Sequence, residues 1–169
     1  MLNRNFKTVL TTGFTLIELV VVVVILGILS IFPIMKRAPL AELTLPSQAQ
    51  KLASDIRHAQ VLATTWGKNL QLNFTAGANG AYSLSCVSKE TSPPCNVSPV
   101  IDPATGTNFV TKLQKDIILA GTSTVSLNSM GQPSTAAILT LCYPDCITKT
   151  NPTKTITVQS LTGYVTVSP

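Results

Sequence analysis

Apolar and polar residues divide the start of the chain into two parts. A polar segment that contains Arg4 and Lys7 is followed by seventeen uncharged, mostly apolar residues from Leu19 to Met35. As a helix, residues 14–35 would reach roughly 33 Å, enough to span the hydrocarbon core of a bilayer. A cleaved secretory signal peptide is the alternative, but the sequence Ile28-Leu29-Ser30 lacks the small residues of its cleavage site. We therefore expect residues 14–35 to form a transmembrane helix.

A second helix is predicted by apolar residues that recur alternately every four and every three positions. They are Leu45, Ala49, Leu52, Ile56, Ala59, Ala63 and Trp66. Residues 47–50 have the form of a capping box, and Gly67 is a typical helix end. The pattern predicts an amphipathic helix over residues 45–66, with Lys51, Asp55 and His58 on a solvated face beside the apolar stripe. Pro33 and Pro39 are expected to bend or interrupt the helix before it.

Beyond Gly67 the apolar period changes to two, which is typical of half-buried strands. Residues 70–74 and 82–86 predict a hairpin, and a proline-rich loop is expected between Ser88 and Asn108. Five further strands are expected at residues 117–120, 124–128, 137–142, 154–159 and 164–167. The apolar stripe of the helix must pack on this sheet. The predicted fold class is therefore α+β, with a long N-terminal helix on an antiparallel β-sheet.

Four cysteines indicate an oxidising compartment, and three disulfide pairings are possible. Local pairing, Cys86 with Cys95 and Cys142 with Cys146, is favoured because the turn formers Pro93-Pro94 and Pro144-Asp145 lie between the partners. The competing interpretation is a four-thiolate zinc site, which needs both pairs brought together in a reducing compartment.

The sequence offers little that could support catalysis. His58 is the only histidine, and no serine or cysteine nucleophile is phased with it. Asp102 and Asp145 each lie alone in a loop, which is too few oxygens for a calcium site. No metalloprotease, P-loop or dinucleotide-binding motif occurs. We expect no enzyme, no cofactor and no metal.

The motif Gly13-Phe14-Thr15-Leu16-Ile17-Glu18 ahead of the apolar run resembles the signature of type IV pilins and type II secretion pseudopilins. The resemblance implies that a prepilin peptidase cuts between Gly13 and Phe14 and methylates the new amine of Phe14. It also implies that Glu18 pairs with that amine on a neighbouring subunit during assembly. A buried acid at the centre of a membrane helix costs about 2.5–3.5 kcal/mol on insertion scales, so such an acid implies a partner.

The resemblance also implies how the chain is divided and where it lies. Residues 1–13 would be the leader peptide, residues 14–35 the transmembrane and assembly helix, and residues 36–169 a periplasmic domain. The protein would be anchored in the bacterial inner membrane and then enter a pilus or pseudopilus filament. Its partners would be other pilin subunits, the peptidase and the inner-membrane assembly platform. Loss of Arg4 and Lys7 with the leader would leave ten basic against seven acidic residues, a mild positive charge.

The later sequence narrows the resemblance to minor pilins of the GspH/FimT type and minor subunits of mannose-sensitive pili. The segments that carry it are Ser54–Phe74, Val125–Gln132 and Thr157–Val167. A major pilin remains an alternative, although a further strand pair after Cys146 favours a minor subunit. The other alternative is a DNA-binding minor pilin for DNA uptake. The position where such pilins carry arginines reads Gly163-Tyr164-Val165-Thr166 here, and the candidate contacts are Lys112, Lys115, Lys149 and Lys154.

Overall fold

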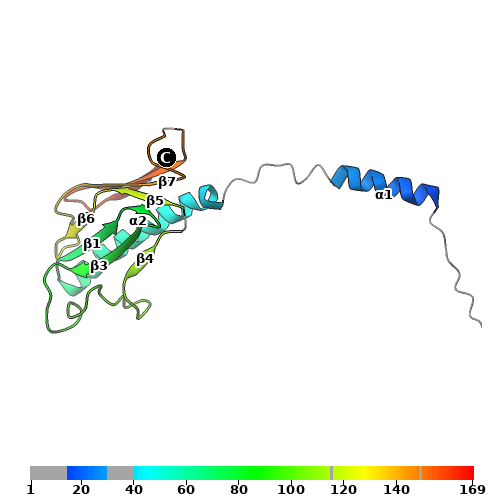
Figure 1. Cartoon of the computed structure of the whole chain (residues 1–169). Helices are drawn as coiled ribbons and strands as arrows, with labels where there is room; N and C mark the ends of the chain where they lie inside the picture. The colour runs from blue at the N-terminus through cyan, green and yellow to red at the C-terminus, as the bar shows by residue number, and fades with distance from the viewer. Residues whose placement is uncertain (1–14, 30–39, 115, 149) are drawn as a thin grey trace, which may run out of the picture. The chain divides into compact units, whose positions relative to one another are not determined.

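The computed structural model describes residues 15–29, 40–114, 116–148 and 150–169. It separates into two units, residues 1–37 and residues 38–169 (Figure 1). The expected transmembrane segment therefore lies in the first unit, and residues 30–35, Pro33 and Pro39 lie outside the described residues.

The first unit contains helix α1, Leu16–Leu29, which is apolar on every side except at Glu18. Its described large apolar side chains are all exposed, with fractions from 44 % at Val22 to 80 % at Leu16. Within the described residues, no helix combines the length and apolarity that crossing a bilayer requires.

The second unit is organised around helix α2, Leu40–Trp66. This helix begins five residues before the predicted start, because residues 40–43 are strong helix formers, and it continues through Pro46. Ser47 does not cap a helix start. It lies inside α2, where its hydroxyl donates to the carbonyl of Thr44 at 2.7 Å. The predicted apolar stripe faces the core, and its members from Leu45 to Ala63 are at most 1 % exposed.

Two antiparallel sheets pack with α2, which contacts β1, β7, β8 and β9. The first sheet has the strand order β4-β3-β1-β6 and the second β2-β5-β7-β8-β9. The strands are β1 (Leu70–Thr75), β2 (Gly77–Ala78), β3 (Ala81–Cys86), β4 (Val110–Lys112), β5 (Ile118–Gly121), β6 (Thr124–Leu127), β7 (Ala137–Cys142), β8 (Thr153–Val158) and β9 (Val165–Ser168). This α+β architecture confirms the predicted fold class.

The single sheet that the sequence suggested is divided at Gly121. There the chain leaves β5 of the second sheet and enters β6, which pairs with β1 of the first. Gly121 has a φ of 112°, and a Cβ at this position would collide with the carbonyl oxygen of Ile138. A glycine permits this close crossing because it has no side chain.

Disulfide bonds join Cys86 to Cys95 and Cys142 to Cys146, with Cα–Cα distances of 5.5 and 5.3 Å. These are the two local pairings favoured above. The first bond ties down the proline-rich loop after β3. The second closes the turn after β7.

Candidate functional site

The start of α1 holds the described part of the pilin-like motif. The N–H of Glu18 is shared between the carbonyl oxygen of Thr15 at 3.1 Å and its Oγ1 at 3.3 Å. Thr15 therefore caps the helix, and Glu18 stands three residues later in the first turn, where a negative charge is favourable. Sequence reasoning overlooked this role, although Thr15-x-x-Glu18 has the form of a capping box. Gly13 and Phe14 lie outside the described residues.

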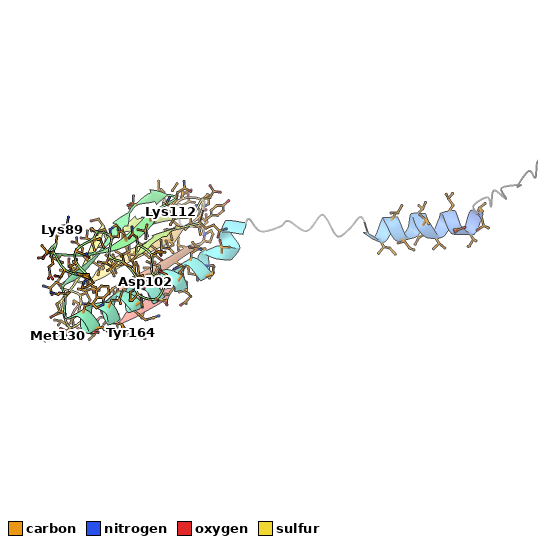
Figure 2. The ribbon with its side chains drawn as sticks, turned by 90° about the horizontal axis from the view of Figure 1, so that it is seen from below. Lys89, Asp102, Lys112, Met130 and Tyr164 are labelled. Carbon is orange, nitrogen blue, oxygen red and sulfur yellow. A yellow bond between two sulfur atoms is a disulfide. The ribbon has the colours of Figure 1, made fainter. Side chains whose placement is uncertain are left out.

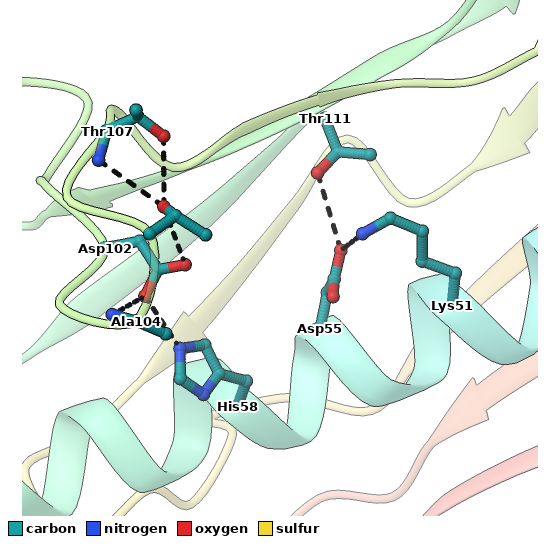
Figure 3. A network of polar contacts seen from close by, with 8 residues as sticks. Lys51, Asp55, His58, Asp102, Ala104, Thr107 and Thr111 are labelled. Carbon is teal, nitrogen blue, oxygen red and sulfur yellow. Dashed lines mark hydrogen bonds and ion pairs between the residues drawn. The ribbon is translucent and has the colours of Figure 1, made fainter.

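The polar face of α2 is tied to the first sheet through Asp55 (Figure 3). Its Oδ2 pairs with Nζ of Lys51 at 2.7 Å and accepts the hydroxyl of Tyr82 at 2.6 Å and that of Thr111 at 3.4 Å. Burial raises the pKa of Tyr82, and its hydrogen bond and proximity to the Asp55 carboxylate raise it further. Tyr82 therefore stays a neutral donor that joins β3 to the helix.

A second pair docks the loop before β4 onto α2. Nε2 of His58 lies 3.1 Å from Oδ1 of Asp102 (Figure 3). The His58 ring also stacks on Phe109, with ring centroids 5.9 Å apart. The expectation about Asp102 concerned only its own loop and did not foresee this pair, because the two residues are 44 positions apart and only folding brings them together. Partial burial raises the pKa of Asp102, but hydrogen bonds from the Ala104 N–H and from His58 outweigh it and hold that pKa below 3.8.

Two of the four lysines considered for DNA contact lie in the described residues. Lys112 lies on β4 of the first sheet, whereas Lys154 lies on β8 of the second. Lys115 and Lys149 lie outside the described residues.

Two turns lie against α2 at Gln60. Nε2 of Gln60 donates to the carbonyl of Gly163, between β8 and β9, at 2.7 Å. Gly131, between β6 and β7, has a φ of 73°, and a Cβ there would lie 2.7 Å from the backbone oxygen of Gln60. One turn of helix earlier, Nη2 of Arg57 donates to the carbonyl of Val165 at 2.8 Å. Gln60 and Arg57 thus bond the β8–β9 turn and the start of β9 to the helix, and the β6–β7 turn packs closely against the Gln60 backbone.

Exposed apolar side chains surround this junction. Val61, Met130, Leu161 and Tyr164 expose 58, 72, 76 and 63 % of their area, and we call these four residues the turn surface. Figure 2 shows Met130 and Tyr164 beside the C-terminal part of α2. A hollow of about 300 Å³ lies at the junction, and Arg57, Val61, Met130 and Thr162 are among its lining residues.

Comparisons with known proteins found similarity in both units of the chain. Residues 11–32 match the family model of the prokaryotic N-terminal methylation motif. Two crystal structures of the type IV minor pilin FimU from Pseudomonas aeruginosa share the fold, each at 13 % sequence identity. The first match covers 78 % of this chain and 93 % of that chain with a TM-score of 0.56. The second covers 74 % and 93 % with a TM-score of 0.53. No curated protein sequence matches the chain significantly.

The molecule is thus an α+β protein whose methylation motif contains the apolar helix α1 and whose fold is shared with the minor pilin FimU. The chain is therefore similar to methylated prokaryotic proteins over residues 11–32 and to the minor pilin FimU in its fold.

Proposed function

We propose that the chain is a structural minor pilin or pseudopilin, a subunit that assembles through its N-terminal helix into a type IV pilus or a pseudopilus. One observation carries this proposal. The methylation motif over residues 11–32 includes all of α1, on a chain that shares the fold of the minor pilin FimU.

The motif supports a defined maturation. A prepilin peptidase cleaves between Gly13 and Phe14 and methylates the Phe14 amine, and the second unit lies in the periplasm while the helix holds the protein in the inner membrane. The two disulfides support this location, because such bonds persist in oxidising compartments.

The apolar surface of α1 supports the route into a filament. A helix that is apolar all round must be buried in lipid or against other helices. Lipid surrounds the helix of the single subunit, and the N-terminal helices of neighbouring subunits pack around it in the fibre. Glu18 then meets the Phe14 amine of a neighbour. This ion pair offsets the cost of burying both charges, a cost of about 2.5–3.5 kcal/mol for an acid at the membrane centre.

The test measures how much of a Glu18→Ala variant enters filaments in the native host. We expect normal leader removal and membrane fractionation, but at least a tenfold loss from sheared filaments, because the neighbour's amine has no partner. Immunoblots of the membrane and filament fractions measure both quantities.

Thr15→Ala is the matched control, because it removes the helix cap seen in the structure and keeps the carboxylate. A lost cap costs the helix about 1 kcal/mol, and we expect incorporation to persist. Equal losses in both variants would assign Glu18 to the helix start and refute its pairing role. A natural protein that retains residues 1–13 and never enters a fibre would refute the proposed function itself.

A further inference from the structure

We propose that the turn surface, Val61, Met130, Leu161 and Tyr164, docks a different pilin-like subunit whose contacting face is apolar and carries a carboxylate. This inference rests on the proposed function, since it names a partner for the domain of an assembling subunit.

The first observation is the convergence of exposed apolar side chains. Three segments that are distant in sequence contribute them: α2, the turn between β6 and β7, and the turn between β8 and β9. Each of the four side chains exposes more than half of its area. Val61 and Met130 line the hollow, and Leu161 and Tyr164 flank Thr162, which also lines it. Scattered exposed apolar residues are ordinary, but a group on three neighbouring segments beside one hollow indicates an interaction surface.

The second observation is that hydrogen bonds hold both turns in place. Oδ1 of Asn128 accepts the N–H groups of Met130 and Gln132, each at 2.9 Å. In the other turn, the Tyr164 N–H donates to Oγ1 of Thr162 at 3.3 Å. Gln60 anchors that turn to the helix through Gly163. A surface that is ordered before binding loses little conformational entropy on binding, which favours affinity.

The third observation is the charge at the hollow. Arg57 is the one charged side chain that lines it. Its Nη2 donates to the carbonyl of Val165, and none of the ion pairs of the described residues includes Arg57. A guanidinium has five N–H donors and binds carboxylates in a bidentate manner. The complementary face of the partner therefore carries an acid among apolar residues.

The carboxylates of this chain disfavour a second copy of it as the partner that binds the turn surface. In residues 44–169, the described carboxylates of Asp55 and Glu90 each pair with a lysine of the same chain, and that of Asp102 bonds to the ring of His58. Asp145 accepts hydrogen bonds within its own turn. Of the described carboxylates in this range, Asp116 alone has neither kind of partner, so a second copy offers a poor match to Arg57. A different subunit that is richer in acids fits better.

The experiment is site-specific photocrosslinking of the full-length protein in its native host. A benzophenone amino acid replaces Met130, and in a control chain it replaces Ile147, which is 91 % exposed. Ile147 follows β7 whereas Met130 precedes it, so the two sites lie at opposite ends of a six-residue strand. Both side chains point to solvent, and the substitutions leave the core intact. Mass spectrometry identifies the products.

We expect the Met130 probe to join a different protein that has its own N-terminal methylation motif, with at least tenfold more product than the Ile147 probe. Adding Arg57→Glu to the Met130 probe should lower that product at least fivefold. Lys112→Glu, the same charge change on β4, should leave it unchanged.

A product with a second copy of this chain, a product with nucleic acid, or a yield no higher than that of Ile147 would overturn the inference. These results are distinguishable from failure of the proposed function. If the proposed function is wrong, the leader stays uncleaved and the chain is absent from filaments, whichever residue carries the probe.

Discussion

The contact of Gly131 with α2 makes a quantitative prediction about stability. Gly131 and Gly106 have nearly the same backbone conformation, with φ of 73° and 70°. A Cβ on Gly106 meets nothing within 4 Å, whereas a Cβ on Gly131 lies 2.7 Å from the Gln60 backbone oxygen and 3.1 Å from Cγ2 of Thr64. Both alanine variants therefore place an L-residue at a positive φ, and they differ in whether the new Cβ collides with α2.

The shared strain is that of an L-residue in the left-handed region, about 1–2 kcal/mol. Gly106→Ala should lower the free energy of unfolding by about this amount. Gly131→Ala adds overpacking of about 1–3 kcal/mol, because the Gln60 carbonyl belongs to the backbone of α2 and cannot rotate away. We expect a total loss of about 2–5 kcal/mol for Gly131→Ala.

Residues 38–169 are suited to the measurement. This unit contains every buried apolar side chain of the described residues and both disulfides, so its core is complete without α1. Trp66, the single tryptophan, lies at the end of α2 against that core and reports unfolding by fluorescence. Urea titrations that keep a common m-value give the difference directly. Equal losses in the two variants would refute the close approach of the turn to Gln60.

Two further predictions concern the polar contacts of α2. The depressed pKa of Asp102 means that its carboxylate contributes stability above pH 3.8, and that this contribution disappears as the pH falls through the folded-state pKa. Asp102→Asn should therefore lower thermal stability at pH 6 and differ less from the natural protein near pH 3, whereas Asn at the exposed Asp116 should change little at either pH. Tyr82→Phe removes the 2.6 Å bond to the Asp55 carboxylate, and it should cost about 1.5–3 kcal/mol in urea titrations, as expected for a bond to a charged group. No loss would show that water replaces the hydroxyl.

The local pattern of residues was sufficient to predict most of the helices and strands and to recognise the pilin-like motif. The four-and-three spacing from Leu45 to Ala63 identified the buried stripe of α2, since a helix returns to the same face at those steps. Alternation identified the hairpin of β1 and β3, whose register puts Leu70 opposite Cys86 and Leu72 opposite Leu84. The pilin-like motif over residues 13–18 needed no fold to be recognised, because its residues are contiguous in the sequence.

Some local features were still misjudged. The capping signal at Ser47 suggested a helix start inside what is a continuous helix, because a cap-like sequence costs little when strong helix formers precede it. The short strands β2 and β4 were missed, since two or three residues carry too little alternation to be recognised.

The tertiary structure alone decided which distant groups meet. Periodicity records which face of a strand is buried but not its partner, so the division into two sheets at Gly121 was not predictable. The approach of Asp102 to His58 and of Gly131 and Gly163 to Gln60 likewise depends on chain closure over tens of residues. The sequence by itself thus determined most of the helices and strands and the pilin-like motif. Only the packing of α2 against both sheets decided where the turns stand and which apolar side chains they expose, because those positions follow from long-range contacts.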